Sequence, residues 1–183
     1  MSGKADNPNA ECPQGMPERT MSKDEEPKPS NPLGLARAWW PAMVWIGLIS
    51  IESTDAFSSQ NTGSLLYSLL TRLFGNVDLS QFLLFHFYLR KTGHVIGYGM
   101  LALLLLRGWR MTIGPVRARL GKMLLLSWIG TVFIASMDEW HQSFIPSRTG
   151  TVHDVILDSV AGFVFLLLAY LWLRRDETTR QAA

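Results

Sequence analysis

Cysteine is nearly absent from this chain, since Cys12 is the only one among 183 residues. A single cysteine cannot close an internal disulfide, so no disulfide framework is expected. The chain also has little excess of one sign of charge over the other. The formal net charge is +2, and no basic stripe is interleaved with aromatic residues. That balance argues against nucleic acid as a partner.

Long uninterrupted apolar runs are missing too, but four short ones are present. They lie within residues 38–53, 92–106, 122–137 and 155–173, and their uncharged parts are only 13 to 15 residues long. A helix needs roughly 20 residues to cross a bilayer core of about 30 Å. The runs are therefore either buried helices of a soluble protein or membrane spans whose charged flanks enter the interface. The tryptophans near their ends favour the membrane, where such residues form an aromatic belt. We predict an all-α, polytopic membrane protein with a bundle of four transmembrane helices.

The rest of the chain divides around this bundle. Residues 1–32 are rich in Pro, Glu, Lys and Ser, and we expect a disordered polar tail. The membrane domain is expected over residues 36–175, followed by a short tail over 176–183. Between the first two spans, residues 62–74 repeat leucine at helical spacing, which predicts an extra amphipathic helix in the membrane interface.

Lysine and arginine are more frequent before the first span, between the second and third, and after the fourth. The richer side of a membrane protein faces the cytoplasm. Both termini are therefore predicted to be cytoplasmic, which requires an even number of crossings.

With this topology, unusual polar residues gather at the outer ends of the spans. The candidate functional cluster consists of Lys91, His94, Tyr98, Asp138, Glu139, His141, Gln142, Arg148, Asp154 and Asp158. Charged groups at membrane depth cost on the order of 2.5–3.5 kcal/mol each, so they face the bundle interior and pair. A purely structural ion-pair network remains an alternative to a functional cluster.

Helical spacing indicates which members of the cluster share a face. Lys91, His94 and Tyr98 stand at i, i+3 and i+7 of one helix, and Asp154 and Asp158 stand one turn apart on another. Asp138, His141 and Gln142 share a face of the third span, and Glu139 is expected to point elsewhere. The simplest pairing sets Lys91 and Arg148 opposite the four acids.

These residues form a pattern that resembles a known family. Lys91-x-x-His94-x-x-x-Tyr98, Asp138-Glu139-x-His141-Gln142 with Arg148-x-Gly150, and Asp154-x-x-x-Asp158-x-x-x-Gly162 are similar to the motifs of the VanZ-like family. The resemblance covers about residues 40–173. It implies a small integral membrane protein of the bacterial cell envelope, placed in the cytoplasmic (inner) membrane, with an effect on glycopeptide susceptibility. It implies no catalytic roles.

Three functions follow as hypotheses. The outer pocket binds an anionic lipid or a cell-wall precursor head group, with Lys91 and Arg148 holding its phosphate or carboxylate. Alternatively, the same cluster forms a membrane-embedded hydrolase or transferase with His94 or His141 as general base. A transporter or proton relay is the third, although no internal repeat supports it. A metal variant would use Glu139, His141 and Asp154, but no motif such as HExxH is present, so neither a metal nor a cofactor is expected.

Overall fold

The computed structural model describes residues 32–113, 119–148 and 150–182, with side chains up to residue 175. The tail predicted over residues 1–32 lies outside this part except for Pro32. The described elements are α1 (Pro32–Glu52), the 3₁₀ turn η2 (Asp55–Phe57), α2 (Ser59–Phe74), α3 (Leu79–Ile113), α4 (Leu120–Gln142) and α5 (Val152–Ala182). Within the described ranges no β-strand occurs, so the predicted all-α class is confirmed.

Three of the described helices are long and apolar enough to cross a membrane. They are α1, α4 and the Val152–Arg175 part of α5. Helices rise about 1.5 Å per residue, so the 21 and 23 residues of α1 and α4 match a hydrocarbon core of about 30 Å. The charged flanks of the uncharged runs are also helical, so each helix is longer than its uncharged run and long enough to span. The fourth predicted span, residues 92–106, lies inside the 35-residue α3, where histidine, tyrosine and glycine interrupt the leucines.

The helices are packed with small and polar residues inside and large apolar residues outside. Ser127, Thr131 and Asp158 are fully buried, whereas Phe133 and Trp172 are 59% and 68% exposed. Exposed apolar surface on this scale would be an aggregation hazard in water. In a bilayer it is the natural lipid-facing surface, so the distribution supports the membrane assignment.

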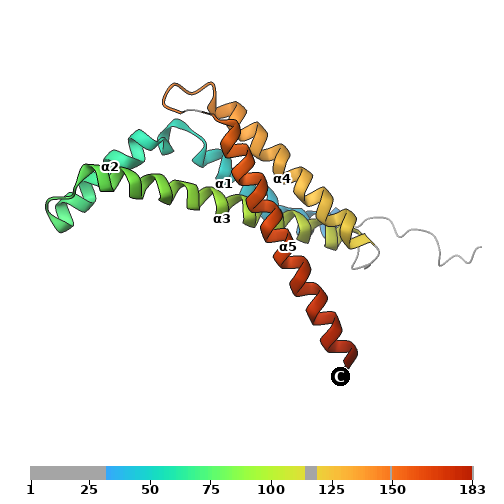
Figure 1. Cartoon of the computed structure of the whole chain (residues 1–183). Helices are drawn as coiled ribbons and strands as arrows, with labels where there is room; N and C mark the ends of the chain where they lie inside the picture. The colour runs from blue at the N-terminus through green and yellow to red at the C-terminus, as the bar shows by residue number, and fades with distance from the viewer. Residues whose placement is uncertain (1–31, 114–118, 149, 183) are drawn as a thin grey trace, which may run out of the picture. The chain divides into compact units, whose positions relative to one another are not determined.

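Helix α3 is the centre of the bundle, because it packs against α1, α4 and α5, and α4 also packs against α5 (Figure 1). Glycine permits the closest of these contacts. A Cβ on Gly99 would lie 2.6 Å from the ring of Phe165, and one on Gly162 would lie 2.9 Å from Thr131. Small residues at these positions let the backbones approach closely, as in other membrane helix pairs.

The extra helix predicted over residues 62–74 is present as α2 and begins three residues earlier than expected. The Ser58 hydroxyl accepts a hydrogen bond from the Asn61 backbone and caps the helix, and Gly75 ends it with φ +80°. The chain then turns into α3, whose start is capped by Asp78 through the backbone N–H groups of Ser80 and Gln81. Together with the Ser80 hydroxyl, these donors lower the pKa of Asp78.

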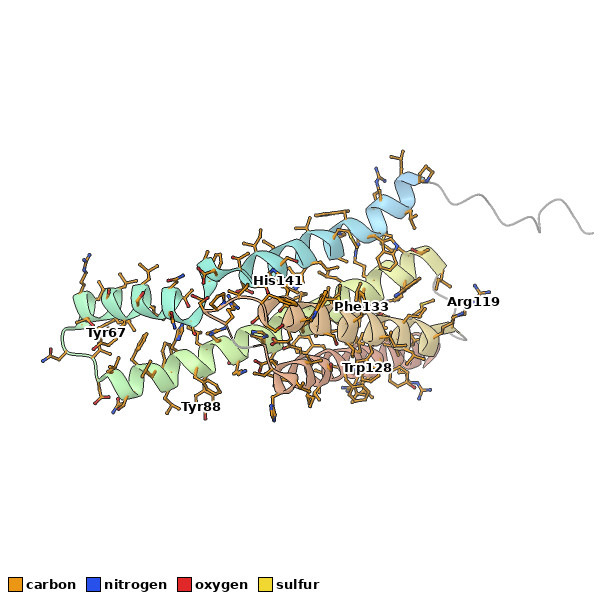
Figure 2. All side chains as sticks on the ribbon, turned by 90° about the horizontal axis from the view of Figure 1, so that it is seen from above. Tyr67, Tyr88, Arg119, Trp128, Phe133 and His141 are labelled. Atoms are coloured by element: carbon orange, nitrogen blue, oxygen red, sulfur yellow. The ribbon has the colours of Figure 1, made fainter. Side chains whose placement is uncertain are left out.

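Helix α2 packs against the first part of α3, and aromatic residues mediate the contact. Tyr67 lies between the two helices, with its ring 5.0 Å from that of Phe82, whereas Tyr88 points away from α2 (Figure 2). Because α3 is continuous from Leu79, the aromatic segment before the second predicted span belongs to the same helix as that span. The polar residues before and within the second predicted span therefore lie on one helix.

Candidate functional site

Three polar side chains on one face of α3 each contact an acid on a neighbouring helix. The pairs are Lys91 with Asp154, His94 with Asp158, and Tyr98 with Asp138. His94 Nδ1 lies 3.2 Å from Asp158 Oδ2, and the Tyr98 hydroxyl donates to Asp138 Oδ2 at 2.9 Å. The predicted shared face of α3 is therefore present, and its three residues tie α3 to α5 twice and to α4 once.

Glu139 was predicted as a member of the cluster on a different face of its helix from Asp138. It is only 5% exposed, and a ligating atom lies within 4.8 Å of one from His94 and one from Asp158. Its Oε2 accepts a hydrogen bond from the backbone N–H of Thr151 at 2.8 Å. Helix α4 packs against both α3 and α5, so residues on two of its faces lie inside the bundle.

Gly150 explains how the loop between α4 and α5 returns so close to α4. A Cβ at this position would collide with the carbonyl oxygen of Glu139 and lie 3.0 Å from the backbone nitrogen of Ser143. The glycine is needed for close approach, since its φ is not in the left-handed region. The loop can thus place the Thr151 N–H against Glu139.

Arg148 does not pair with the acids as the simplest sequence pairing proposed. Its Nη2 donates to the carbonyl oxygens of Glu52 and Thr54, and its Nη1 lies 3.4 Å from Gln142 Oε1. The carbonyls at a helix C-terminus have no intrahelical partners, and a cation there also complements the helix dipole. Arg148 therefore caps the end of α1. Gln142 in turn donates to Asp138 Oδ2 at 3.0 Å, which connects the arginine to the cluster.

His141 stands apart from the remaining candidates. It is exposed, and its Nδ1 lies 3.4 Å from the Ser53 hydroxyl. No acid among the described residues forms an ion pair with it, in contrast to His94. The metal set that was considered from the sequence, Glu139, His141 and Asp154, differs from the group His94, Glu139 and Asp158 that the structure brings together.

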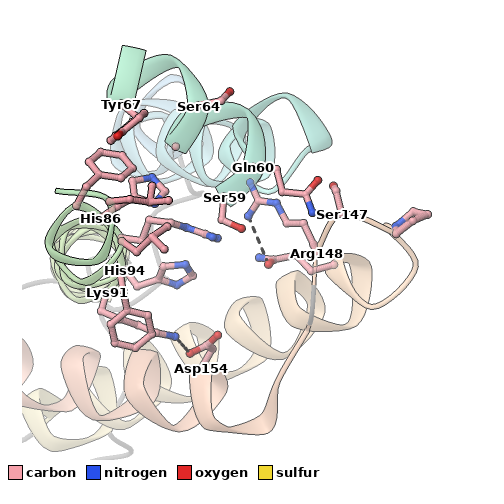
Figure 3. A pocket seen from close by; sticks show the side chains of 18 residues that line it. Ser59, Gln60, Ser64, Tyr67, His86, Lys91, His94, Ser147, Arg148 and Asp154 are labelled. Atoms are coloured by element: carbon pink, nitrogen blue, oxygen red, sulfur yellow. Dashed lines mark hydrogen bonds and ion pairs between the residues drawn. The ribbon is translucent and has the colours of Figure 1, made fainter. Parts of the chain in front are cut away.

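The cluster borders two cavities. The larger, about 710 Å³, lies between α2, α3 and the loop around Arg148 (Figure 3). The second, about 480 Å³, lies towards α1 and α4. His86, Arg90, His94, Gln142 and Arg148 line both.

Two lining residues, His86 and Arg90, were not among the sequence candidates. They precede His94 by eight and four residues, so all three share one face of α3. That spacing is visible in the sequence, but it gains meaning only when α3 is known to be one continuous helix. Burial, and then the charge of Arg90, lower the pKa of His86.

The guanidinium of Arg90 is unusual, because it forms no hydrogen bond or ion pair with any group that the structure describes. It lies near Arg148, and burial followed by the Arg90 charge lowers the pKa of the Arg148 guanidinium. Three cations, Arg90, Lys91 and Arg148, line the larger cavity with one carboxylate, Asp154. The cavity therefore has an excess of positive charge.

Comparison with known proteins agrees with the pattern of motifs. No curated protein and no solved structure matches the chain. Residues 38–173 match the family described as VanZ/LLP1, which covers every member of the candidate cluster. With three apolar helices long enough to span, the chain is an integral membrane protein and belongs to the VanZ/LLP1 family.

Proposed function

We propose that this protein is a cell-envelope protein of the bacterial inner membrane that binds a phosphate-bearing head group in the larger cavity. The head group belongs to an anionic lipid or to a lipid-linked cell-wall precursor. Arg90 and Lys91 approach it from α3, and Arg148 approaches it from the loop before α5. Occupation of this site would affect the availability of precursors and so the susceptibility to glycopeptides.

The observation that carries this proposal is Arg90, whose side chain has no hydrogen-bond or ion-pair partner in the part of the chain that the structure describes. It lies near Arg148 beside a cavity, and two like charges so placed repel each other. A bound phosphate would relieve that repulsion and accept charge-assisted hydrogen bonds from the planar guanidinium. Lys91 and Arg148 already have protein partners, so their contribution is mainly the positive field around the site.

Charge at the opposite end of the bundle supports the orientation of the cavity. Arg107, Arg110, Arg119 and Lys122 flank the loop that joins α3 to α4, as basic residues do on a cytoplasmic side. We infer four crossings, with α3 as the second, so that both termini would lie in the cytoplasm and the cavity would lie at the outer surface. Head groups of the outer leaflet would be within reach of it.

The test compares binding to the full-length wild-type chain with binding to Arg90→Gln, by native mass spectrometry or fluorescence titration in detergent. The two anionic probes are phosphatidylglycerol and a polyprenyl diphosphate, and the comparison lipid is zwitterionic phosphatidylcholine, whose phosphate is balanced by its own ammonium group. A charge-assisted hydrogen bond contributes about 1.5–3 kcal/mol, so Arg90→Gln should bind the favoured phosphate probe about 10- to 100-fold more weakly.

Arg72→Gln is the matched control, because Arg72 is exposed at the end of α2 and lines neither cavity. It should bind like the wild type. Preference for the diphosphate identifies a precursor, and equal binding of both phosphate probes identifies a general anionic-lipid site. Equal affinities of wild type and Arg90→Gln, or equal losses in Arg90→Gln and Arg72→Gln, would refute a phosphate site in this cavity.

A further inference from the structure

Two carboxylate oxygens in the cluster are buried without a hydrogen-bond partner among the described residues. They are Oε1 of Glu139 and Oδ1 of Asp158, whose side chains are 5% and 0% exposed. An unpaired oxygen of this kind normally costs about 1–3 kcal/mol, and more when the group is charged. In native structures such groups are commonly completed by a bound ion or an ordered water. These two oxygens are therefore candidate ligands for an ion.

His94 provides the third member of the arrangement. One ligating atom from each of His94, Glu139 and Asp158 lies within 4.8 Å of the other two. Around a tetrahedral Zn²⁺ with bonds of about 2.0–2.2 Å, neighbouring ligand atoms are roughly 3.3–3.6 Å apart. The 3.2 Å between His94 Nδ1 and Asp158 Oδ2 is already close to that separation. We propose that His94, Glu139 and Asp158 bind a divalent metal ion of the zinc class.

The charges of the three residues match this ion. Two carboxylates and a neutral imidazole carry two negative charges, and a divalent cation cancels both. Neutrality is important because all three groups sit within helices of a membrane bundle, where an uncompensated charge is expensive. The donor set of one imidazole nitrogen and carboxylate oxygens suits zinc, and three protein ligands leave a fourth coordination position open.

The surrounding structure holds the ligands in place. The Thr151 N–H donates to Glu139 Oε2, and Oε1 has no hydrogen-bond partner among the described residues. The three ligands come from three helices, α3, α4 and α5, so an ion would connect the core of the bundle. Outer contacts that orient ligands in this way are a usual part of metal sites. The proposal does not depend on head-group binding.

The experiment is a zinc titration of the full-length, untagged protein in detergent after removal of metal with a chelator. The parent protein and all variants carry Cys12→Ser, because a cysteine thiolate can itself bind zinc. Equilibrium dialysis should give one Zn²⁺ per chain, and thermal unfolding should move to higher temperature when Zn²⁺ is added. Co²⁺ should give visible d–d absorption without a sulfur charge-transfer band.

Glu139→Gln and Asp158→Asn keep the shape of each side chain and remove its charge. Each should weaken zinc binding more than the roughly 10- to 100-fold that loss of a supporting residue costs. His153→Gln and Glu52→Gln are controls, since both residues are exposed at the same end of the bundle, and they should bind zinc like the parent. If a cluster variant fails to fold, the number of Zn²⁺ ions bound per parent chain still decides whether the site exists. A parent that binds no zinc, or binds it no better than the double variant Glu139→Gln/Asp158→Asn, overturns the site and shows that protons balance the carboxylates.

Discussion

Arg148 Nη2 lies 3.0 Å from the carbonyl oxygen of Thr54, although the two residues are 94 positions apart in the chain. The same atom also donates to the carbonyl of Glu52. The loop between α4 and α5 is thereby fastened to the end of α1. Ser147 strengthens the connection by donating to Asp55.

We therefore predict that Arg148→Lys destabilises the protein even where no ligand is present. The three N–H donors of a lysine all lie on one nitrogen, so they cannot span both carbonyls and Gln142 as the nitrogens of a planar guanidinium do. The expected loss is about 1.5–3 kcal/mol, measured as thermal unfolding in detergent. Arg72→Lys is the control and should stay within about 0.5 kcal/mol of the wild type. An unchanged Arg148→Lys protein would show that the carbonyl contacts contribute little.

Glycines of α3 provide a matched pair for testing how the bundle is packed. Gly99→Ala should destabilise by about 1–3 kcal/mol, because its methyl group would meet the ring of Phe165. Gly97→Ala, two residues away, has nothing within 4 Å of its added Cβ and should gain up to about 1 kcal/mol from helix propensity. Thermal unfolding of both variants measures the difference. Equal effects would mean that α5 does not pack against α3 as described.

The buried His86 predicts a dependence of stability on pH. Burial and Arg90 lower its pKa in the folded protein below the value of 6.5 expected for the unfolded chain. As pH falls below 6.5, the unfolded state binds a proton that the folded state resists, so folding stability decreases with falling pH. Comparing unfolding at pH 7.5 and 5.5 should show a smaller decrease for His86→Gln than for the wild type. Identical decreases would exclude His86 as a source of this pH dependence.

Membrane topology can be tested with single cysteines in whole cells. The native Cys12 reports on the N-terminal tail, and Gln60→Cys and Gln181→Cys in a Cys12→Ser background report on α2 and on the C-terminal end. We expect Gln60→Cys to react in intact cells, and the other two to react only after permeabilisation. If Cys12 and Gln181→Cys instead differ in accessibility, the chain crosses the membrane an odd number of times, and α3 does not cross it.

Local sequence determined the helices and the level at which the polar residues lie. Apolar periodicity and length identify α1, α4 and α5, and repeated leucines identify α2. The i, i+3, i+7 spacing of Lys91, His94 and Tyr98 fixes a common face, because helix geometry alone sets it. Charges are excluded from the hydrocarbon core, so their positions mark the ends of the spans without any knowledge of packing.

Tertiary structure alone decided which groups meet. The partners of Lys91 and His94 depend on the rotation of α5 against α3, which the contact of Gly99 with Phe165 helps to set. The pairing of Arg148 with the acids was wrong for the same reason, since spacing along one helix says nothing about the faces of its neighbours. Backbone carbonyls such as that of Thr54 carry no sequence signal at all, yet they accept the hydrogen bonds of Arg148. Pairing between helices is a property of their mutual rotation and tilt, and those are set by side-chain packing across the whole bundle.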